Sequence, residues 1–393
     1  MFKTHPFLLH ILSGTFIFVV LLSVLTCASN TQAANHAAWE IIPSQNSRLP
    51  FNELLGVTAI TNTNVWAVGE SFGGNSHQSL IEHWNGKVWQ IVPTPDHSLS
   101  PTLQAVAAIP GTDQAWAVGS QYTAAHGYQP LIERWNGKVW QIVGSPFIKD
   151  QVGNTTNILS SVVAISKDNA WATGIYSNHQ AQTALIEHWN GKQWSIVPGA
   201  SVPANPQSTN LTSITALSPD NIWAVGTSIW SNGYDTFKTL TEHWNGHAWS
   251  YVPAQNPGTG SNILHSVTSI PGTNQLLAVG EASDLYQRSQ MLTERWNGKS
   301  WQVISSTNGK TPGTALTSVT ARSAHDAWAV GEGTGGLIAH WDGTNWNLVS
   351  HPAPVKSVVF SAITYVPKTN TLWAAGSYNA TASTTPTLIE RYS

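Results

Sequence analysis

A glutamate followed by histidine or arginine and then by an aromatic residue recurs along this chain, and these residues have the most evident chemical potential. The glutamates are Glu82, Glu133, Glu187, Glu242, Glu294 and Glu390. Carboxylates can act as general acids or bases, and histidine can bind zinc. A residue that occurs once per repeat cannot converge with its copies on one site, however, and arginine cannot replace histidine as a zinc ligand. We therefore interpret the glutamates as buried acceptors of backbone or indole N–H bonds, and we expect no metal site.

A second set of residues lies beside the repeated motif without being strictly repeated, and it forms the candidate ligand-binding site. The set consists of Trp230, Tyr234, Tyr122, Tyr176, Tyr286, Tyr378, Glu70, Glu281 and Glu332. Aromatic rings can stack on sugars or hold a polypeptide. Two carboxylates from different repeats could instead serve as the acid and base of a glycoside hydrolase. The structural alternative is that these residues extend strands and anchor loops.

Both sets are positioned by a repeat of about 50 residues, which consists of four short runs of strand character. The runs read L-x-x-V-x-A-I, W-A-V-G, L-I-E-H/R-W and W-x-I-V, and we call them A to D. Asn-Gly or Asp-Gly between runs C and D favours a tight hairpin with a type I′ turn. Four antiparallel strands per repeat, without helical periodicity, predict the blade of a β-propeller.

The copies are out of phase with the ends of the chain. The last copy stops at Ser393 without run D, and an isolated run D occurs near the start, at residues 39–43. An all-β, seven-bladed β-propeller of four-stranded antiparallel blades, closed by this N-terminal strand, accounts for the offset. The predicted blades are approximately 54–95, 103–146, 159–199, 211–253, 264–305, 316–350, and 358–393 plus 39–43.

Most variation in repeat length lies in the connections between runs B and C and between runs D and A. In a meandering blade these two connections share one face, and the A–B and C–D turns share the other. We expect function on the B–C/D–A face, because loops can vary there without disturbing the blades.

Tryptophan is the third repeated element, since 19 of the 20 tryptophans occupy positions in runs B, C and D. Indole rings bury a large apolar area, and their spacing places them inside the sheets. We expect them to pack neighbouring repeats against each other. Trp230 is the one tryptophan outside this pattern, which is why it belongs to the candidate site.

Composition and the N-terminal segment limit the class of protein. Charged residues make up 9% of the chain, the net charge is −3, and no basic cluster is available for nucleic acid. Residues 1–33 have the form of a signal peptide, or of an uncleaved anchor that would be the protein's only membrane contact. The domain would then be 34–393, secreted or held at the cell surface. Cys27, the only cysteine, lies in that segment.

The combination of Gly69, Trp84 and Trp89 in the first repeat resembles the Kelch repeat, and Tyr392 matches the tyrosine found in such repeats. The second glycine of the Kelch doublet is replaced, by Glu70 in the first repeat. The pattern is also similar to W-A-V-G…E-H-W-N/D-G repeats of exported bacterial proteins. Both resemblances imply a propeller like the central domain of galactose oxidase. That enzyme's copper site requires a cysteine, which residues 34–393 lack.

No phosphate loop, zinc-protease motif or nucleophile elbow occurs in the sequence. We therefore predict a binding module or scaffold without catalytic residues or cofactor, which recognises a carbohydrate or a protein on the B–C/D–A face. The alternatives are a glycoside hydrolase or polysaccharide lyase that uses the rim carboxylates, and a structural scaffold without a small ligand.

Overall fold

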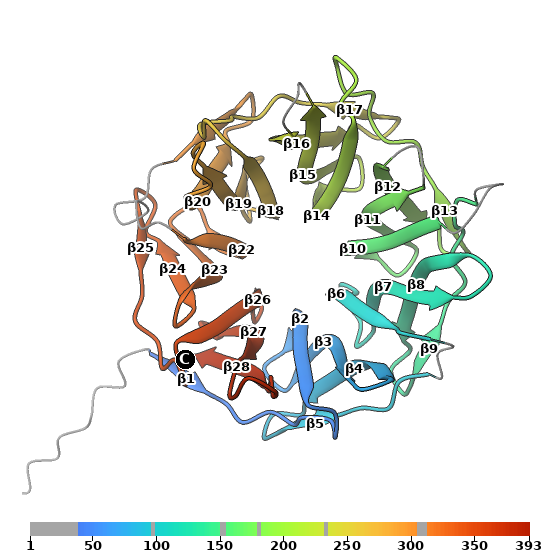
Figure 1. Ribbon diagram of the computed structural model, residues 1–393, viewed down its shortest axis with the longest axis vertical. Helices are drawn as coiled ribbons and strands as arrows, with labels where there is room; N and C mark the ends of the chain where they lie inside the picture. Colours follow the sequence, from blue (N-terminus) through green and yellow to red (C-terminus); the bar gives the residue numbers. More distant parts are fainter. Residues whose placement is uncertain (1–37, 96–98, 150–154, 179–181, 232–234, 305–312) are drawn as a thin grey trace, which may run out of the picture. The chain divides into compact units, whose positions relative to one another are not determined.

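A computed structural model describes residues 38–95, 99–149, 155–178, 182–231, 235–304 and 313–393 (Figure 1). The described residues all belong to the second of two units into which the chain divides, Ala37–Ser393. The predicted signal or anchor segment, residues 1–33, lies outside the described residues. Within the described ranges, no helix combines the length and apolar character needed to cross a bilayer.

The second unit is built from short strands joined by turns. In chain order they are β1 (Trp39–Ile41), β2 (Phe51–Thr61), β3 (Asn64–Gly73), β4 (Ser76–Trp84), β5 (Trp89–Ile91), β6 (Thr102–Ala108), β7 (Ala115–Thr123), β8 (Gly127–Trp135), β9 (Trp140–Ile142), β10 (Thr155–Ser166), β11 (Asn169–Ser177), β12 (Gln182–Trp189), β13 (Trp194–Ile196), β14 (Ser208–Ser218), β15 (Asn221–Ser231), β16 (Asp235–Trp244), β17 (Trp249–Tyr251), β18 (Asn262–Ser269), β19 (Leu276–Ser283), β20 (Ser289–Trp296), β21 (Trp301–Val303), β22 (Ala315–Ser323), β23 (Asp326–Thr334), β24 (Leu337–Trp341), β25 (Trp346–Leu348), β26 (Ser357–Tyr365), β27 (Leu372–Tyr378) and β28 (Thr387–Tyr392).

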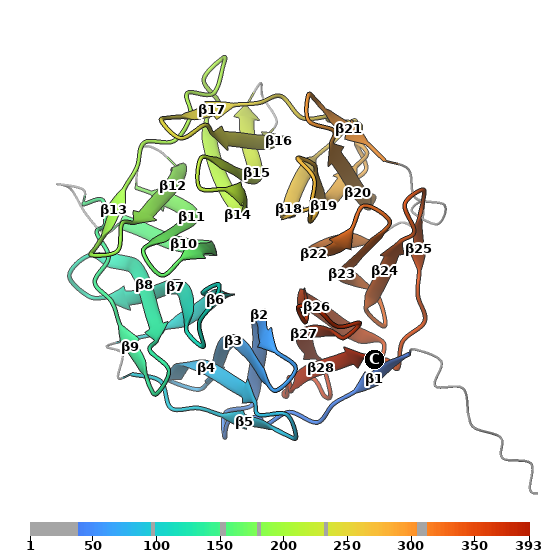
Figure 2. The ribbon, with the colours of Figure 1, turned by 180° about the vertical axis from the view of Figure 1, so that it is seen from behind.

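Sequential antiparallel pairing is the rule, as in the orders β2-β3-β4-β5 and β18-β19-β20-β21. Short parallel pairings of β8 with β10 and of β12 with β14 join neighbouring repeats into a larger sheet. Figures 1 and 2 show the strands of this unit grouped around a central axis. The predicted all-β, antiparallel architecture is confirmed.

The hairpins between runs C and D are present, but their turn differs from the prediction. Trp84 pairs with Trp89, and the N–H of Asn85 donates to the carbonyl of Val88 at 3.3 Å. Positive φ occurs at Gly86 (93°), the first central residue, which is the pattern of a type II′ turn. The Asn85 side chain precedes the turn, where its Oδ1 accepts the N–H groups of Lys87 and Val88. Asparagine therefore stabilises the loop through its side chain, and only the glycine needs positive φ.

Run B ends in glycine because strand A approaches it too closely for any side chain. The A strands carry a β-bulge, which in β2 falls between Leu54 and Gly56. A Cβ atom on Gly69 would lie 1.9 Å from the carbonyl oxygen of Glu53, and one on Gly226 would lie 2.0 Å from that of Asn210. The repeated glycine is thus a packing requirement of the bulge.

The tryptophans pack neighbouring repeats together, as predicted. Trp66 on β3 has its ring centroid 4.6 Å from Trp135 on β8 and 5.2 Å from Trp140 on β9. Trp373, near the end of the chain on β27, contacts Trp84 at 5.1 Å and Trp89 at 5.3 Å. Each of these run B rings is inserted between the run C and run D rings of another repeat.

The two ends of the unit share one sheet. β1 pairs antiparallel with β28, with Trp39 opposite Tyr392 and Ile41 opposite Glu390. The N–H of Ile42 donates to the carbonyl of Ile389 at 2.9 Å. The isolated run D near the start therefore takes the place of the run D that the last repeat lacks (Figure 1).

Candidate functional site

The repeated glutamates are buried, and their partners come from the segment that precedes each repeat. The carboxyl of Glu82 accepts the N–H of Gln45 at 3.2 Å, and that of Glu294 accepts the N–H of Gln255 at 3.1 Å. The hydroxyl of Ser145 donates to Glu187 at 2.7 Å. Each carboxyl thereby ties the incoming connection to the third strand of the next repeat. This confirms backbone N–H donors for part of the set.

Burial makes the charged form of these carboxyls unfavourable. Desolvation raises the pKa of Glu82 and Glu187 from 4.5 to about 8, against a smaller lowering by their hydrogen bonds. For Glu242 and Glu294, desolvation raises the pKa to about 7. These carboxyls are poor general bases in their closed surroundings, and they act as structural hydrogen-bond acceptors.

The residue after each glutamate alternates between histidine and arginine because both can stack on the run B indole. The His83 ring lies 4.2 Å from the Trp66 ring, and its Nε2 is 2.9 Å from Oδ1 of Asn64. The Arg134 guanidinium takes the same place, 4.9 Å from the Trp116 ring. In the described ranges, no group of three potential metal ligands comes together.

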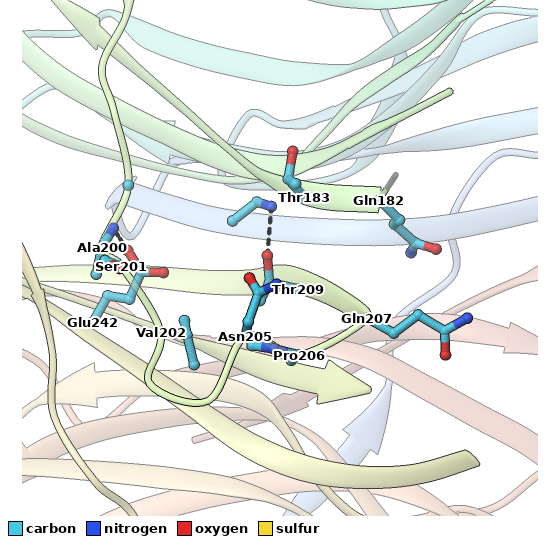
Figure 3. Close-up of a pocket in the computed structure, with 12 residues that line it drawn as sticks. Gln182, Thr183, Ala200, Ser201, Val202, Asn205, Pro206, Gln207, Thr209 and Glu242 are labelled. Atoms are coloured by element: carbon cyan, nitrogen blue, oxygen red, sulfur yellow. Dashed lines mark hydrogen bonds between the residues drawn. The ribbon is translucent and has the colours of Figure 1, made fainter. Parts of the chain in front are cut away.

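A pocket of about 680 Å³ opens on the B–C/D–A face, between the repeat that contains β10–β13 and the repeat that contains β14–β17. It is lined by residues 182–184, 199–202 and 205–207, together with Thr209 and Glu242. Figure 3 draws Glu242 and Ala200 at one end of the pocket and Gln182 and Gln207 at the other. A turn with positive φ at Ala204 and Asn205 shapes the connecting loop. Amides, hydroxyls and one carboxyl dominate the lining.

Glu242 is the only repeated glutamate among the residues that line this pocket. Its Oε2 accepts the N–H of Ala200 at 2.9 Å. A Cβ atom on Gly199 would lie 3.3 Å from the same oxygen and 3.5 Å from Cδ1 of Ile186, so glycine lets the backbone pack closely against the carboxyl. In Glu187 and Glu294, by contrast, Oε1 is sealed inside the protein without a partner among the described residues.

Two of the predicted site residues lie beside the pocket by strand register. Tyr176 pairs with Thr183, which lines the pocket. Trp230 directly follows Ile229, whose carbonyl accepts the N–H of Gln207 at 2.9 Å. The structure therefore brings the hairpin β15–β16 and the connection before β14 together on one face.

The predicted aromatic residues differ widely in exposure. Tyr176 is 9% exposed and belongs to the core around β10 to β12, whereas Tyr286 is 82% exposed. The Trp230 indole donates to the Ser228 hydroxyl at 3.0 Å, and Nζ of Lys238 lies 5.0 Å from its ring. The ring of Tyr122 lies 5.4 Å from that of Tyr128, and Tyr378 packs against the core of the last repeat. Tyr234 lies outside the described residues.

The three predicted glutamates have different surroundings. Glu70 accepts a hydrogen bond from the Thr102 hydroxyl at 2.5 Å, and this bond joins the first repeat to the second. Nε2 of His77 lies 2.6 Å from the Glu70 carboxyl. Hydrogen bonding from His265 is the main factor that lowers the pKa of Glu281. Glu332 is exposed.

Sequence reasoning missed the polar lining of the pocket and placed Glu242 among purely structural residues. A signal was present, because the connection 198–210 stands out as an insertion rich in Ser, Pro, Asn and Gln. Glu53 was also missed: it faces Glu70 in the β2–β3 register, and burial together with the charge of Glu70 raises its pKa.

Comparison with known proteins identifies the fold. No protein-family model matches the sequence, and no curated protein matches it significantly. The structure of YCF48 bound to a D1 peptide is 14% identical, with 91% of this chain and 96% of that chain covered and a TM-score of 0.55. YCF48 from Cyanidioschyzon merolae is also 14% identical, with 91% and 99% covered and a TM-score of 0.56. U3-55K is 10% identical, with 91% and 100% covered and a TM-score of 0.58.

The WD40 repeats of RRP9 match similarly, with 10% identity, coverage of 91% and 99%, and a TM-score of 0.56. WD40 repeats form β-propellers. The chain therefore has a β-propeller fold, which agrees with the sequence prediction.

Proposed function

We propose that this β-propeller is a non-catalytic binding module that holds a segment of another protein on its B–C/D–A face. The observation that carries the proposal is the pocket of about 680 Å³ on that face, with amide and hydroxyl groups that can satisfy a peptide backbone. A propeller of similar structure was solved as YCF48 bound to a D1 peptide, which supports a peptide as the ligand class. Carbohydrate is the second ligand class of the proposal.

The finer architecture belongs to the same proposal. Seven four-stranded, Kelch-like blades, with the boundaries given by the repeats, would form a circle closed by β1. The β1–β28 pairing and the contacts of Trp373 with Trp84 and Trp89 support closure. A closed propeller presents the inter-blade pocket on a rigid frame, which lowers the entropy lost on binding.

The remaining parts of the proposal concern the site and the location. Trp230 and Tyr176 lie beside the pocket, and the more distant Tyr122, Tyr286, Tyr378, Glu70, Glu281 and Glu332 would form contacts elsewhere on the face. We further propose a secreted or surface-held bacterial protein with no cofactor and no nucleic-acid partner. Sequencing the N-terminus of the mature protein tests export: a start near residue 34 supports cleavage, and an intact Met1 contradicts it.

The binding function is tested with peptide and glycan arrays screened in parallel with the full-length protein. Ser201 is exposed at the pocket, so Ser201→Trp should block it without disturbing the core. Lys87→Trp is the matched control, because Lys87 is exposed in the C–D turn on the opposite face. We expect peptides to be retained by the parent and by Lys87→Trp but not by Ser201→Trp. Retention of glycans alone, or equal retention of peptides by all three proteins, would contradict a peptide ligand in this pocket.

A further inference from the structure

A second large hollow, of about 890 Å³, lies on the face of the A–B and C–D turns, and we call it the notch. It is lined by the A–B turns of three repeats: residues 59–62 and Asn64 of the first, residues 108–113 of the second, and Pro367 and Lys368 of the last. All of these residues belong to the described ranges. The notch is therefore on the opposite face from the pocket of the proposed function.

The notch exists because the A–B turns differ in length. In the first repeat the turn is short, since β2 ends at Thr61 and β3 begins at Asn64. The turns of the second and last repeats are longer, at residues 109–114 and 366–371. They stand as walls on either side of the short turn, which forms the floor.

The two walls are held in shape by their own side chains. The Thr112 hydroxyl donates to the carbonyl of Ile109 at 2.8 Å and accepts the N–H of Gln114 at 3.0 Å. In the last repeat, the Thr369 hydroxyl donates to the carbonyl of Val366 at 2.9 Å. Little conformational freedom is then lost when a partner enters the notch.

The sixth repeat shows how the corresponding place is closed from within. Its A–B turn is also short and also precedes a long one, and Arg322 bridges the two: Nη1 donates to the carbonyl of Asn370 at 3.0 Å, and Nε donates to Asp326 at 2.8 Å. Ile60 follows Leu54 at the same spacing as Arg322 follows Leu316. Because isoleucine is shorter and has no donor, the first repeat leaves the place open, with a half-buried apolar side chain in its lining.

The opposite face carries an apolar projection in the loop between β19 and β20. Leu285 is 78% exposed and Tyr286 is 82% exposed, more than any other large hydrophobic residue in the described ranges. We call these two residues the knob. Oδ1 of Asp284 accepts the N–H groups of Tyr286 at 2.9 Å and of Arg288 at 3.1 Å, so the turn that presents the knob is fixed.

We propose that the knob of one copy of this chain enters the notch of a second copy, so that the molecules associate head to tail. Two apolar side chains meet a lining that includes Ile60, Pro110 and Pro367. The surrounding charges are also complementary, because Asp284 and Arg288 flank the knob while Asp113 and Lys368 are exposed at the notch. This inference goes beyond the proposed binding function and uses none of the residues that line its pocket.

The placement of the two features predicts the form of the assembly. Since knob and notch lie on opposite faces, each contact leaves a free knob at one end and a free notch at the other, and growth is open-ended. A contact of this kind is smaller than the roughly 1,200–2,000 Å² buried in stable complexes, so association should be weak and dependent on concentration. A lipid bilayer is the poorer partner, because the cation beside the knob, Arg288, is paired with Asp284 at 2.6 Å.

The test is sedimentation velocity of the full-length protein from micromolar to millimolar concentration. We expect the mean mass of the parent to rise steadily with concentration. Leu285→Ser with Tyr286→Ser removes the knob and should weaken association at least about tenfold. Val88→Ser with Val139→Ser is the matched control, since these valines are 49% and 52% exposed in C–D turns, and it should assemble like the parent.

Two variants fill the notch in different ways. Ile60→Arg copies the side chain that closes the corresponding place in the sixth repeat. Asn62→Trp adds bulk from an exposed position whose known contact, acceptance of the Trp84 indole N–H at 3.0 Å, uses only the backbone carbonyl. Both should be monomeric, and Asn62→Trp should keep the melting temperature of the parent, so that loss of assembly does not reflect unfolding.

Mixing gives the decisive result. The knob variant still has an open notch and the Asn62→Trp variant still has a knob, so an equimolar mixture should form dimers that do not grow further. A parent that stays monomeric throughout would overturn the inference, as would unchanged assembly in the knob variant or a mixture without dimers. A monomeric parent that binds phosphatidylcholine vesicles through Leu285 and Tyr286 would also overturn it and would assign the knob to a membrane surface.

Discussion

The buried glutamates should make the stability of this protein fall as pH rises, and Glu187 is the clearest case. Its carboxyl is fully buried, and its pKa is raised from 4.5 to about 8, mainly by desolvation. Below pH 4.5 the group is protonated in both the folded and the unfolded chain, so its contribution to stability is fully present there. Between pH 4.5 and about 8 the unfolded chain loses the proton first, and the contribution is lost over this window.

The size of the effect follows from the two pKa values. The Glu187 carboxyl has a pKa of 4.5 in the unfolded chain and about 8 in the folded protein. At about 1.4 kcal/mol per pKa unit, the free energy of unfolding should therefore fall by about 5 kcal/mol between acidic pH and a pH above 8. Glu187→Gln removes the titration and keeps an oxygen that can accept the Ser145 hydroxyl. We therefore expect Glu187→Gln to be as stable as the parent or less stable at pH 4.5, and more stable than the parent at pH 8.

The assay is urea unfolding followed by tryptophan fluorescence at pH 4.5, 6, 7 and 8, for the parent, Glu187→Gln and the exposed control Glu332→Gln. Glu332→Gln should follow the parent at every pH. The argument from buried, protonated carboxyls is wrong if the free energy of unfolding changes with pH in parallel for the parent and Glu187→Gln. It is also wrong if Glu187→Gln is less stable than the parent at pH 8.

Three further predictions concern the repeated framework. Gly226→Ala should destabilise the protein by about 3 kcal/mol or more, because the new Cβ would lie 2.0 Å from the carbonyl oxygen of Asn210. Gly144→Ala is the control, since its new Cβ would have nothing within 4 Å and should leave thermal unfolding unchanged. Equal melting temperatures of the two variants would contradict the bulge argument. Trp373→Ala should lower the free energy of unfolding by about 3–5 kcal/mol, because the ring packs against Trp84 and Trp89. Trp373→Leu should lower it less, because Leu277 fills the equivalent place in the fifth repeat. If urea unfolding shows the leucine variant to be the less stable of the two, packing at this position does not decide stability. Deletion of residues 38–43 should lower the melting temperature and cause aggregation, because β28 would become an unpaired sheet edge. Light scattering detects the aggregation. A monomer with an unchanged melting temperature would argue against the role of β1.

Several elements could be predicted because the information is local and repeated. The alternation of runs A to D specifies strands, and Asn-Gly specifies hairpins such as that at Asn85 and Gly86. The missing run D of the last repeat predicts that β1 pairs with β28, because an unpaired strand edge leaves backbone groups without partners. The turn type was predicted incorrectly, since Asn85 acts through its side chain and only Gly86 has positive φ.

The candidate site was only partly predictable, because its chemistry depends on access. Glu242 and Glu294 share the same motif, and both accept a backbone N–H, yet only Glu242 lines the pocket. That difference arises from the course of the connection between β13 and β14 over a neighbouring repeat, with Gly199 next to the carboxyl and positive φ at Asn205. Similarly, Tyr176 lies within β11 and its ring is buried, whereas Tyr286 lies in the loop between β19 and β20 and its ring is exposed.

The sequence by itself thus determined the strands and the repeat, because backbone hydrogen bonding and side-chain alternation act between near neighbours in each repeat. It also determined the pairing of the chain ends, because the last repeat lacks the strand that β1 supplies. Tertiary structure alone decided which repeated carboxyl meets a pocket and which aromatic ring is free. Those properties depend on how a loop from one repeat packs on the next, and on the desolvation and space that result.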